Sequence, residues 1–222
     1  MKNRMTATLA VALLAGAASA QSTVAQWNLQ NTLGSQATQA GIGSTNVTAS
    51  NLARGAGLTA NAGNNSFNSR GWNDVAANDF VSLGFTVDAG KLIDLAFLYI
   101  GTRSSATGPK NLGLFYSVDG FSSALHTFDQ PSEAFVNTQV DLTGLANVGG
   151  AVKFRILALD NVAAGGGTVT SAGTFRVGAF FSGGVFNRNL QFAGSNPFNV
   201  PTPGALALLG VGGLVAARRR RA

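Results

Sequence analysis

The sequence predicts an all-β protein, a β-sandwich of the jelly-roll type, and three observations support this fold class. From Phe80 onward, apolar and polar residues alternate with a period of two, which is typical of strands that bury one face. Glycine-rich turns separate these runs, at Gly149-Gly150, Gly165 to Gly167 and Gly183-Gly184. Outside the two ends of the chain, no segment shows a sustained helical period. Short strands at this spacing indicate two packed sheets with Greek-key connections.

Six segments have the alternating pattern and are predicted to be strands. They are residues 80–87, 92–100, 112–118, 135–142, 151–159 and 174–181. In the second of these, the residues predicted to share one face are Ile93, Leu95, Phe97 and Tyr99. Because the opposite face of that segment is also mainly apolar, we expect it to be a central strand. An Asp119-Gly120 pair after the third segment predicts a tight hairpin turn.

The stretch from residue 31 to residue 73 is rich in Gly, Ala, Asn, Ser, Thr and Gln and sparse in apolar residues. Such a composition is compatible with a disordered spacer. We favour loops with one or two short edge strands, because Ile42, Val47 and Leu52 could pin such strands to a sheet. The predicted domains are a signal peptide at 1–20, a β-sandwich at 21–200 whose part 21–73 is loop-rich with edge strands, and a sorting tail at 201–222.

The net charge of +6 belongs to the two ends of the chain. Residues 21–200 contain three Lys and six Arg, which balance eight Asp and one Glu. A body without net charge gives no electrostatic basis for phosphate binding, so a nucleic-acid partner is excluded. The absence of cysteine excludes disulfides, thiolate zinc sites and cysteine nucleophiles.

The first twenty residues have the three parts of a secretory signal. A short basic region precedes an apolar stretch that runs to about Ala18, and Ala18-Ser19-Ala20 supplies the small residues that signal peptidase accommodates. We expect cleavage after Ala20 and a mature chain that begins at Gln21. Signal peptidase is therefore a predicted partner, and the body is predicted to be exported.

At the other end, thirteen uncharged residues, Ala205 to Ala217, precede Arg218, Arg219, Arg220 and Arg221. As a helix with ~1.5 Å rise per residue this segment spans roughly 20 Å, less than the ~30 Å hydrocarbon core of a bilayer. It predicts a short hydrophobic helix that anchors the protein in the inner membrane transiently. By the positive-inside rule the arginines stay in the cytoplasm, so the body lies across the membrane, as the N-terminal signal also requires.

Pro201, Pro203 and Gly204 precede this apolar segment and form a Pro-x-Pro-Gly core, with Thr202 at the second position. Together with the apolar helix and the arginines, this arrangement resembles the PEP-CTERM sorting signal of Gram-negative bacteria, over residues 200–221. The family has Glu where this chain has Thr202. The resemblance implies that exosortase, a membrane protease-transpeptidase, processes the tail, and that the body reaches the cell surface or an exopolysaccharide matrix.

Residues 102–121, TRSSATGPKNLGLFYSVDGF, resemble a recurring segment of secreted bacterial β-sandwich domains that carry this C-terminal signal. The residues that carry the resemblance are Arg103, Ser104, Gly108, Pro109, Ser117, Asp119, Gly120 and Phe121. It implies a jelly-roll fold related to galactose-binding-like modules and is not tied to an established activity.

No residue constellation predicts an enzyme, a cofactor or a metal site. His126 is the only histidine, no Gly-x-Ser-x-Gly elbow occurs, and the apolar neighbours of His126 indicate strand packing. One histidine without cysteine excludes the usual zinc ligand sets. Asp74 and Asp79 fall close together in a loop-like region, where turn and capping roles are favoured over a calcium site.

The sequence favours a non-enzymatic, exported protein of the cell surface or extracellular matrix. The alternative is a carbohydrate-binding module for exopolysaccharide, and a secreted hydrolase is a third hypothesis. Aromatic rings on a sandwich either stack on sugars or lie in the core, and arginines either bind an acidic polysaccharide or tie down loops. The residues predicted for ligand contact are Trp72, Arg103 and Tyr116, with Trp27 and Arg70 weighed beside them.

Overall fold

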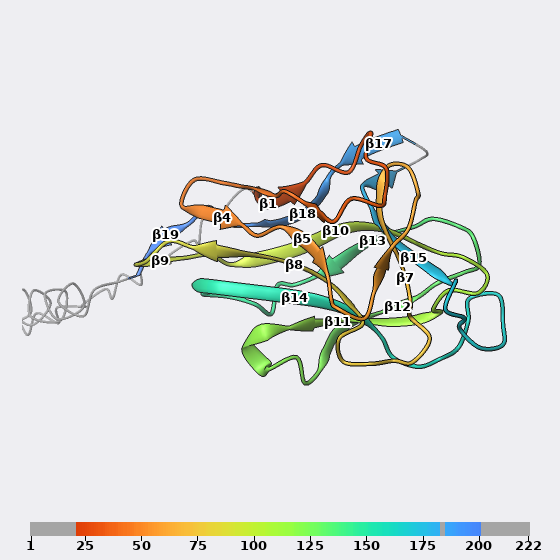
Figure 1. Ribbon diagram of the computed structural model, residues 1–222. Helices are drawn as coiled ribbons and strands as arrows, with labels where there is room; N and C mark the ends of the chain where they lie inside the picture. The colour runs from red at the N-terminus through yellow and green to blue at the C-terminus, as the bar shows by residue number, and fades with distance from the viewer. Residues whose placement is uncertain (1–20, 183–184, 201–222) are drawn as a thin grey trace, which may run out of the picture.

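The computed structural model describes residues 21–182 and 185–200. The predicted signal peptide with Ala18 and Ala20, the turn at Gly183-Gly184, the tail at 201–222 and both predicted terminal helices lie outside this part of the chain. Within it, strands dominate, and the helical element is a 3-10 turn, η1 (Ser117–Asp119). No helix in the two described ranges is long and apolar enough to cross a bilayer. The strands form two packed sheets, so the predicted all-β sandwich is confirmed (Figure 1).

The larger sheet, sheet A, has eight strands, and all of its pairings are antiparallel. Its order is β3 (Ile42–Gly43), β1 (Ser22–Trp27), β18 (Leu190–Gly194), β10 (Leu95–Ser104), β15 (Thr174–Gly178), β7 (Ser66–Arg70) and β6 (Thr59–Ala60), and β13 (Val136–Asp141) pairs with β10. Strand β10 is central because it pairs with β18, β15 and β13, as its apolar composition predicts.

Sheet B has seven strands and covers the other side of the core. Its order is β12 (Ala124–Asp129), β11 (Asn111–Tyr116), β14 (Gly150–Ala158), β8 (Phe80–Val87), β5 (Leu52–Arg54) and β2 (Thr38–Gln39), and β4 (Val47–Ala49) pairs with β8. Two separate antiparallel pairs join β16 (Phe180–Ser182) to β17 (Val185–Arg188) and, far apart in the sequence, β9 (Lys91–Leu92) to β19 (Phe198–Asn199). The chain passes repeatedly from one sheet to the other, for example between β12, β13 and β14.

The two-residue period is confirmed in the central strands of sheet B. In β8, the residues predicted to share one face, Val81, Leu83, Phe85 and Val87, are all buried. In β14, Val152, Phe154 and Ile156 point inward, while Lys153 is exposed. These strands place one apolar face against the core, which is the main source of their stability.

Strand β10 departs from the predicted face. Its register against β18 shifts between Leu95 and Phe97, so a β-bulge at this point reverses the alternation. The side chains of Leu98 and Ile100 therefore point into the core, and those of Phe97 and Tyr99 project from the outer face of sheet A. The prediction that Phe97 and Tyr99 share one face with Leu95 is wrong, because alternation alone does not reveal a bulge.

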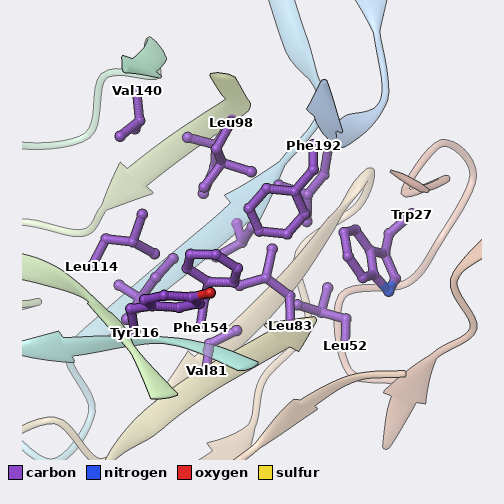
Figure 2. Packing of buried hydrophobic residues seen from close by; sticks show 14 of the residues in the cluster. Trp27, Leu52, Val81, Leu83, Leu98, Leu114, Tyr116, Val140, Phe154 and Phe192 are labelled. Carbon is purple, nitrogen blue, oxygen red and sulfur yellow. The ribbon is translucent and has the colours of Figure 1, made fainter. Parts of the chain in front are cut away.

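Aromatic side chains join the two sheets across the core (Figure 2). The ring of Phe192 in sheet A makes edge-on contacts with Trp27 and Phe85, and lies 4.6 Å from the ring centroid of Phe154 in sheet B. Trp27 also donates a hydrogen bond from Nε1 to the carbonyl of Ser50, at 2.8 Å. Such pairs add roughly 0.5–1.5 kcal/mol each beyond the area that they bury.

Within residues 21–73, β1 and β7 are paired on both sides, whereas β2, β3 and β6 lie at sheet edges. Arg54 holds the loop of this region. Its guanidinium donates hydrogen bonds to the carbonyls of Gly34, Gln36 and Asn68 at 2.6–2.9 Å and lies 3.7 Å over the ring of Phe67. Burial lowers the pKa of Arg54 to about 10. The Arg54 guanidinium is thus held by contacts within the fold.

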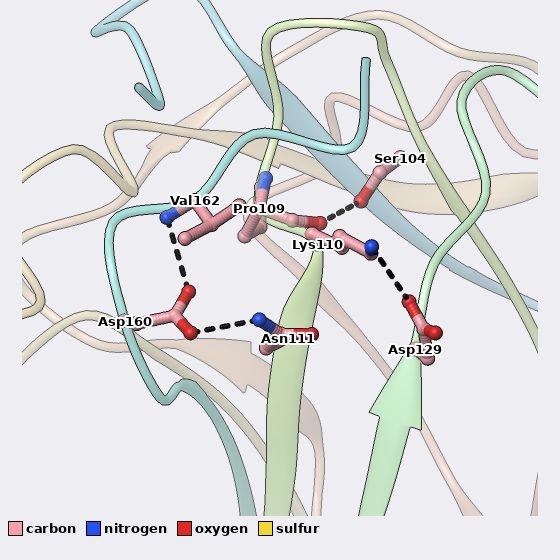
Figure 3. A network of polar contacts seen from close by, with 7 residues as sticks. All are labelled: Ser104, Pro109, Lys110, Asn111, Asp129, Asp160 and Val162. Carbon is pink, nitrogen blue, oxygen red and sulfur yellow. Dashed lines mark hydrogen bonds and ion pairs between the residues drawn. The ribbon is translucent and has the colours of Figure 1, made fainter. Parts of the chain in front are cut away.

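The loop after β10 is fixed by polar contacts and by a close approach of backbone (Figure 3). The Ser104 hydroxyl donates to the carbonyl of Pro109 at 2.6 Å, and Asn111 donates to Asp160 at 2.7 Å. A Cβ on Gly108 would lie 2.1 Å from the carbonyl oxygen of Thr174, so this position requires glycine. The segment 102–121 therefore carries mostly structural residues.

Candidate functional site

A hairpin covers part of the outer face of sheet A. After β15 the chain breaks at Ala179 and continues as β16 and β17, seen at the top of Figure 1. The backbone of Ala179 lies directly against Gly101 of β10. A Cβ added to Gly101 would lie 2.3 Å from the carbonyl oxygen of Ala179. Asn137 Oδ1 accepts a hydrogen bond from the backbone N–H of Phe181 at 3.0 Å, and Phe180 packs edge-on against Tyr99. The hairpin thus rests on β10 and β13, and hollows lie on both of its sides.

The first hollow, the tyrosine hollow, has a volume of about 400 Å³. Its lining residues are Gln21, Ser22, Thr23, Tyr99, Asn187, Arg188, Gln191 and Ala193. The guanidinium of Arg188 lies 4.0 Å over the ring of Tyr99, and Gln191 donates to the Thr23 hydroxyl at 3.3 Å. A ligand that enters this hollow therefore meets a guanidinium, amides and hydroxyls, while the ring of Tyr99, 7% exposed, is covered by Arg188 and Phe180.

A row of amide side chains crosses sheet A beneath this hollow. The cross-strand register places Gln139, Tyr99, Gln191 and Gln26 side by side on β13, β10, β18 and β1. Directly opposed residues of antiparallel strands project from the same face. Each amide both donates and accepts hydrogen bonds, so the row forms a neutral, hydrogen-bonding strip.

The second hollow, the phenylalanine hollow, has a volume of about 350 Å³ and lies on the other side of the hairpin. Its lining residues are Asn64, Asn65, Phe135, Asn137, Gly178, Ala179 and Phe181. Phe135 is 49% exposed and Phe181 is 36% exposed, so both rings present apolar surface to a ligand. The hollow combines two aromatic rings with three amide side chains.

The hollows are suited to binding, and their composition does not provide acid–base chemistry. Neither lining contains Asp, Glu or His, so no proton donor or acceptor for hydrolysis is placed there. Flat rings with amides around them can hold a ligand that has an apolar face and a polar edge.

Two of the residues predicted for ligand contact lie elsewhere. Trp72 is completely buried and packs edge-on against Phe175, so a role in stacking on a ligand is contradicted by its position. Tyr116 is 7% exposed and stacks on Phe154 in the core at 4.8 Å, and burial raises its pKa. Trp27 is also buried in the core. The sequence shows that these residues are aromatic, but gives no sign of which strand face is covered.

Arg103, the third predicted contact, projects from the outer face of sheet A. Its guanidinium lies 5.7 Å from the ring centroid of Phe135, at the edge of the phenylalanine hollow. The structure therefore brings Arg103 together with Phe135 and separates it from Trp72 and Tyr116. The aromatic residues of the site, Tyr99, Phe135 and Phe181, were missed. A signal for Phe135 was available, since an aromatic residue follows a turn-forming Pro-Ser-Glu segment.

His126 and the Asp74–Asp79 pair lie outside the two hollows. His126 is on β12, where its ring packs against Phe128 at 4.8 Å, and burial lowers its pKa. The described residues contain no group of three or more His, Asp or Glu side chains that could hold a metal ion. The carboxyl of Asp79 is nearly buried beside that of Asp74.

No protein-family model matches this sequence, and no curated protein matches it. Among solved structures, the chain is similar to two variants of CBM29-2, a family 29 carbohydrate-binding module studied for ligand recognition. One variant replaces a tyrosine by alanine and the other a lysine; both are 11% identical to this chain, with TM-scores of 0.39 and 0.37. The matches cover 78% of this chain and 93% and 91% of those chains. Similarity at this level assigns no function, which has to come from the residues of this chain.

Proposed function

We propose that this protein is an exported, non-enzymatic β-sandwich whose hairpin-covered face binds a polysaccharide. The observation that carries the proposal is the combination of aromatic rings and amide side chains in the two hollows beside the β16–β17 hairpin. Their volumes of about 400 and 350 Å³ fall within the range of roughly 300–1,000 Å³ that is usual for small-ligand sites.

The chemistry of a sugar ring matches these hollows. Its hydroxyl edge both donates and accepts hydrogen bonds, as do Asn64, Asn137 and Gln191. Its C–H face is apolar and can lie on an aromatic ring, for which Phe135 and Phe181 offer exposed surface. The neutral, amide-rich strip across sheet A extends the same chemistry beyond the hollows. A long polymer could therefore make several weak contacts at once, and these contacts add up.

Export to the cell surface or extracellular matrix is the second part of the proposal. It rests on the predicted signal peptide and on the resemblance of the tail to a PEP-CTERM signal, which implies processing by exosortase. Cleavage after Ala20 would place the new amino terminus at Gln21, which lines the tyrosine hollow. The repeated crossing of the chain between sheets supports the predicted jelly-roll connectivity.

The export proposal is tested by fractionating cells that produce the full chain and a variant truncated before Pro201. We expect the mature protein to begin at Gln21 by mass spectrometry, and we expect the truncated variant to lose its retention at the membrane. A chain found in the cytosol with residues 1–20 still attached would contradict the proposal.

The binding proposal is tested by electrophoresis of the full chain in gels that contain a polysaccharide, over a panel of neutral and acidic polymers. Phe135→Ala should weaken binding about tenfold, since an exposed aromatic anchor of this kind contributes on the order of 1–2 kcal/mol. Leu125→Ala is the matched control, because Leu125 is 38% exposed on sheet B, away from both hollows. Migration unaffected by every polymer in the panel would refute the proposal.

A further inference from the structure

Two arginines lie directly opposite each other on the outer face of sheet A. Arg103 of β10 and Arg176 of β15 are cross-strand partners, and like charges in this arrangement destabilise an antiparallel pair. Within the described ranges, no carboxylate lies within 4.0 Å of either guanidinium, and the ion pair present there joins Lys110 to Asp129. Neither guanidinium donates a hydrogen bond to a described residue. The sheet therefore holds two cations together without a counter-charge.

Other arginines of the body are engaged by structure. Arg54 donates hydrogen bonds to backbone carbonyls, and Arg155 on sheet B lies between the rings of Phe80 and Phe121, at 4.2 and 4.0 Å. Arg103 has one distant ring neighbour, Phe135 at 5.7 Å. Among the described residues, Arg103 and Arg176 thus share the lack of a polar partner with the exposed Arg70 nearby, and differ in this from Arg54 and Arg155.

The pair borders the phenylalanine hollow. Along β10 and β15, the arginine pair lies two residues from the Gly101–Gly178 pair and so on the same face of the sheet, and Gly178 lines the hollow. A Cβ on Gly63 would lie 3.0 Å from Cζ of Arg176, so this guanidinium lies against the backbone just before Asn64 and Asn65. A ligand in the hollow would reach both guanidinium groups.

Nearby charges leave this corner of the sheet positive. Arg70, opposite Thr174 on β7, is exposed on the same face and adds a third cation. Glu133 is the neighbouring carboxylate: its backbone N–H donates to the carbonyl of Ser104 at 2.9 Å, but its side chain forms no ion pair with a described residue. A body with no net charge therefore carries a local excess of positive charge beside a sugar-sized hollow.

Guanidinium groups bind oxyanions through two parallel N–H···O bonds, and arginine keeps its proton at every physiological pH. Building on the proposed function, we propose that the Arg103–Arg176 pair makes this surface selective for acidic polysaccharides. An anionic group of one sugar residue is held between the two guanidiniums while the ring of that residue occupies the phenylalanine hollow. Carboxylates of uronic acids and sulfate esters share this chemistry.

The proposal is tested with the full chain by gel retardation on three polymers: polygalacturonate, the same polymer after carboxyl reduction, and a sulfated polysaccharide. We expect at least tenfold tighter binding to an acidic polymer than to the carboxyl-reduced one. Tighter binding to polygalacturonate identifies the carboxylate as the anionic group, and tighter binding to the sulfated polymer identifies sulfate. Equal binding to the acidic and reduced polymers overturns the selectivity and leaves the proposed function standing, whereas no binding to any polymer refutes both.

Variants locate the effect. Arg103→Gln and Arg176→Gln should each weaken binding to the acidic polymer about tenfold and leave binding to the reduced polymer unchanged. Lys153→Gln, which removes an exposed cation from sheet B, is the matched control and should bind as the wild type does. Equal losses in all three variants, or equally tight binding of single-stranded DNA, would show a general attraction of polyanions and would overturn the proposal.

Discussion

Two regions of this molecule each bring like charges together, Asp74 with Asp79 and Arg103 with Arg176. In the acidic region Asp79 is only 3% exposed, and its carboxyl lies close enough to that of Asp74 for the two to influence each other's protonation. Burial, followed by the proximity and the charge of Asp74, raises the pKa of Asp79 to about 6. A bound proton can therefore remove the repulsion.

In the basic region, no change of protonation removes the repulsion between Arg103 and Arg176. Burial and then the charge of Arg103 lower the pKa of Arg176, yet a guanidinium holds its proton throughout the physiological range. The difference shows that an acid pair can be a self-contained structural feature, whereas an arginine pair keeps both charges until an external anion arrives. Each of the following variants breaks or sharpens that contrast.

The largest effect is expected from a variant that displaces the β16–β17 hairpin from β10, next to the basic region. Gly101→Ala places a Cβ 2.3 Å from the Ala179 carbonyl oxygen, so β10 and the hairpin must separate. We expect a loss of about 2–3 kcal/mol in the free energy of unfolding by urea, and at least tenfold weaker polysaccharide binding, because both hollows lose a wall. Gly144→Ala, which meets no atom within 4 Å, is the control. Wild-type stability and binding of Gly101→Ala would show that the hairpin does not depend on this contact.

The acidic region predicts a pH dependence of stability. The pKa of Asp79 is raised from 3.8 to about 6 in the fold, so between these values the folded chain holds a proton that the unfolded chain has lost. The stabilisation is present below pH 4 and is lost as the pH rises through 6. Relative to the Asp79→Asn variant, the wild type should therefore lose stability in urea unfolding between pH 5 and pH 7, whereas the lowered pKa of His126 acts in the opposite direction in both proteins.

Asp79→Asn should remove part of this dependence and stabilise the protein at pH 7 by about 1 kcal/mol, since a neutral amide replaces a buried charge. Asp88→Asn, which removes a carboxylate from an exposed position, is the control. An unchanged pH profile in Asp79→Asn would show that another group titrates.

The basic region predicts the opposite relation between stability and function. Arg176→Gln removes a like-charge pair and should raise the free energy of unfolding by roughly 0.5 kcal/mol at low salt, even though it weakens binding to acidic polymers. Thermal unfolding at two salt concentrations measures this gain, which should shrink as salt increases. A loss of stability in this variant would show that Arg176 supports the fold directly.

The smallest effect concerns the neighbouring carboxylate. Glu133→Gln removes the negative charge beside Arg103, and we expect about twofold tighter binding to an acidic polymer with no change for the reduced polymer. Gel retardation at low salt measures the difference. Weaker binding of Glu133→Gln would mean that Glu133 contacts the ligand itself.

The sequence predicted the fold class well because burial follows the alternation in strands such as β8 and β14. It predicted the wrong outer residues in β10, since a single bulge near Ala96 reverses every later side chain. Strands β1 and β18 were not among the predicted strands. Their short, partly polar sequences join sheet A through pairing with each other across most of the chain and with β3 and β10.

The candidate site was largely hidden from the sequence. Trp72 and Tyr116 have the composition of a sugar-binding site, but tertiary packing buries them in the core. The bulge in β10 positions Tyr99 on the outer face, and the break at Ala179 positions Phe181 in the hairpin. Both are backbone irregularities without a strong local signal in the sequence. Arg103 was found as a candidate, but its partner Arg176 is 73 positions away and meets it only through the strand register.

The antiparallel contact of Ser22 with Gly194 determines when this body can finish folding. A chain made from its amino terminus must wait for about 170 further residues before β1 obtains its β18 neighbour. Pairing between such distant segments slows folding and leaves strand edges open for longer, during which one nascent copy can associate with another. Conditions that keep copies apart during synthesis should therefore raise the yield of native protein more than conditions that stabilise the finished sandwich.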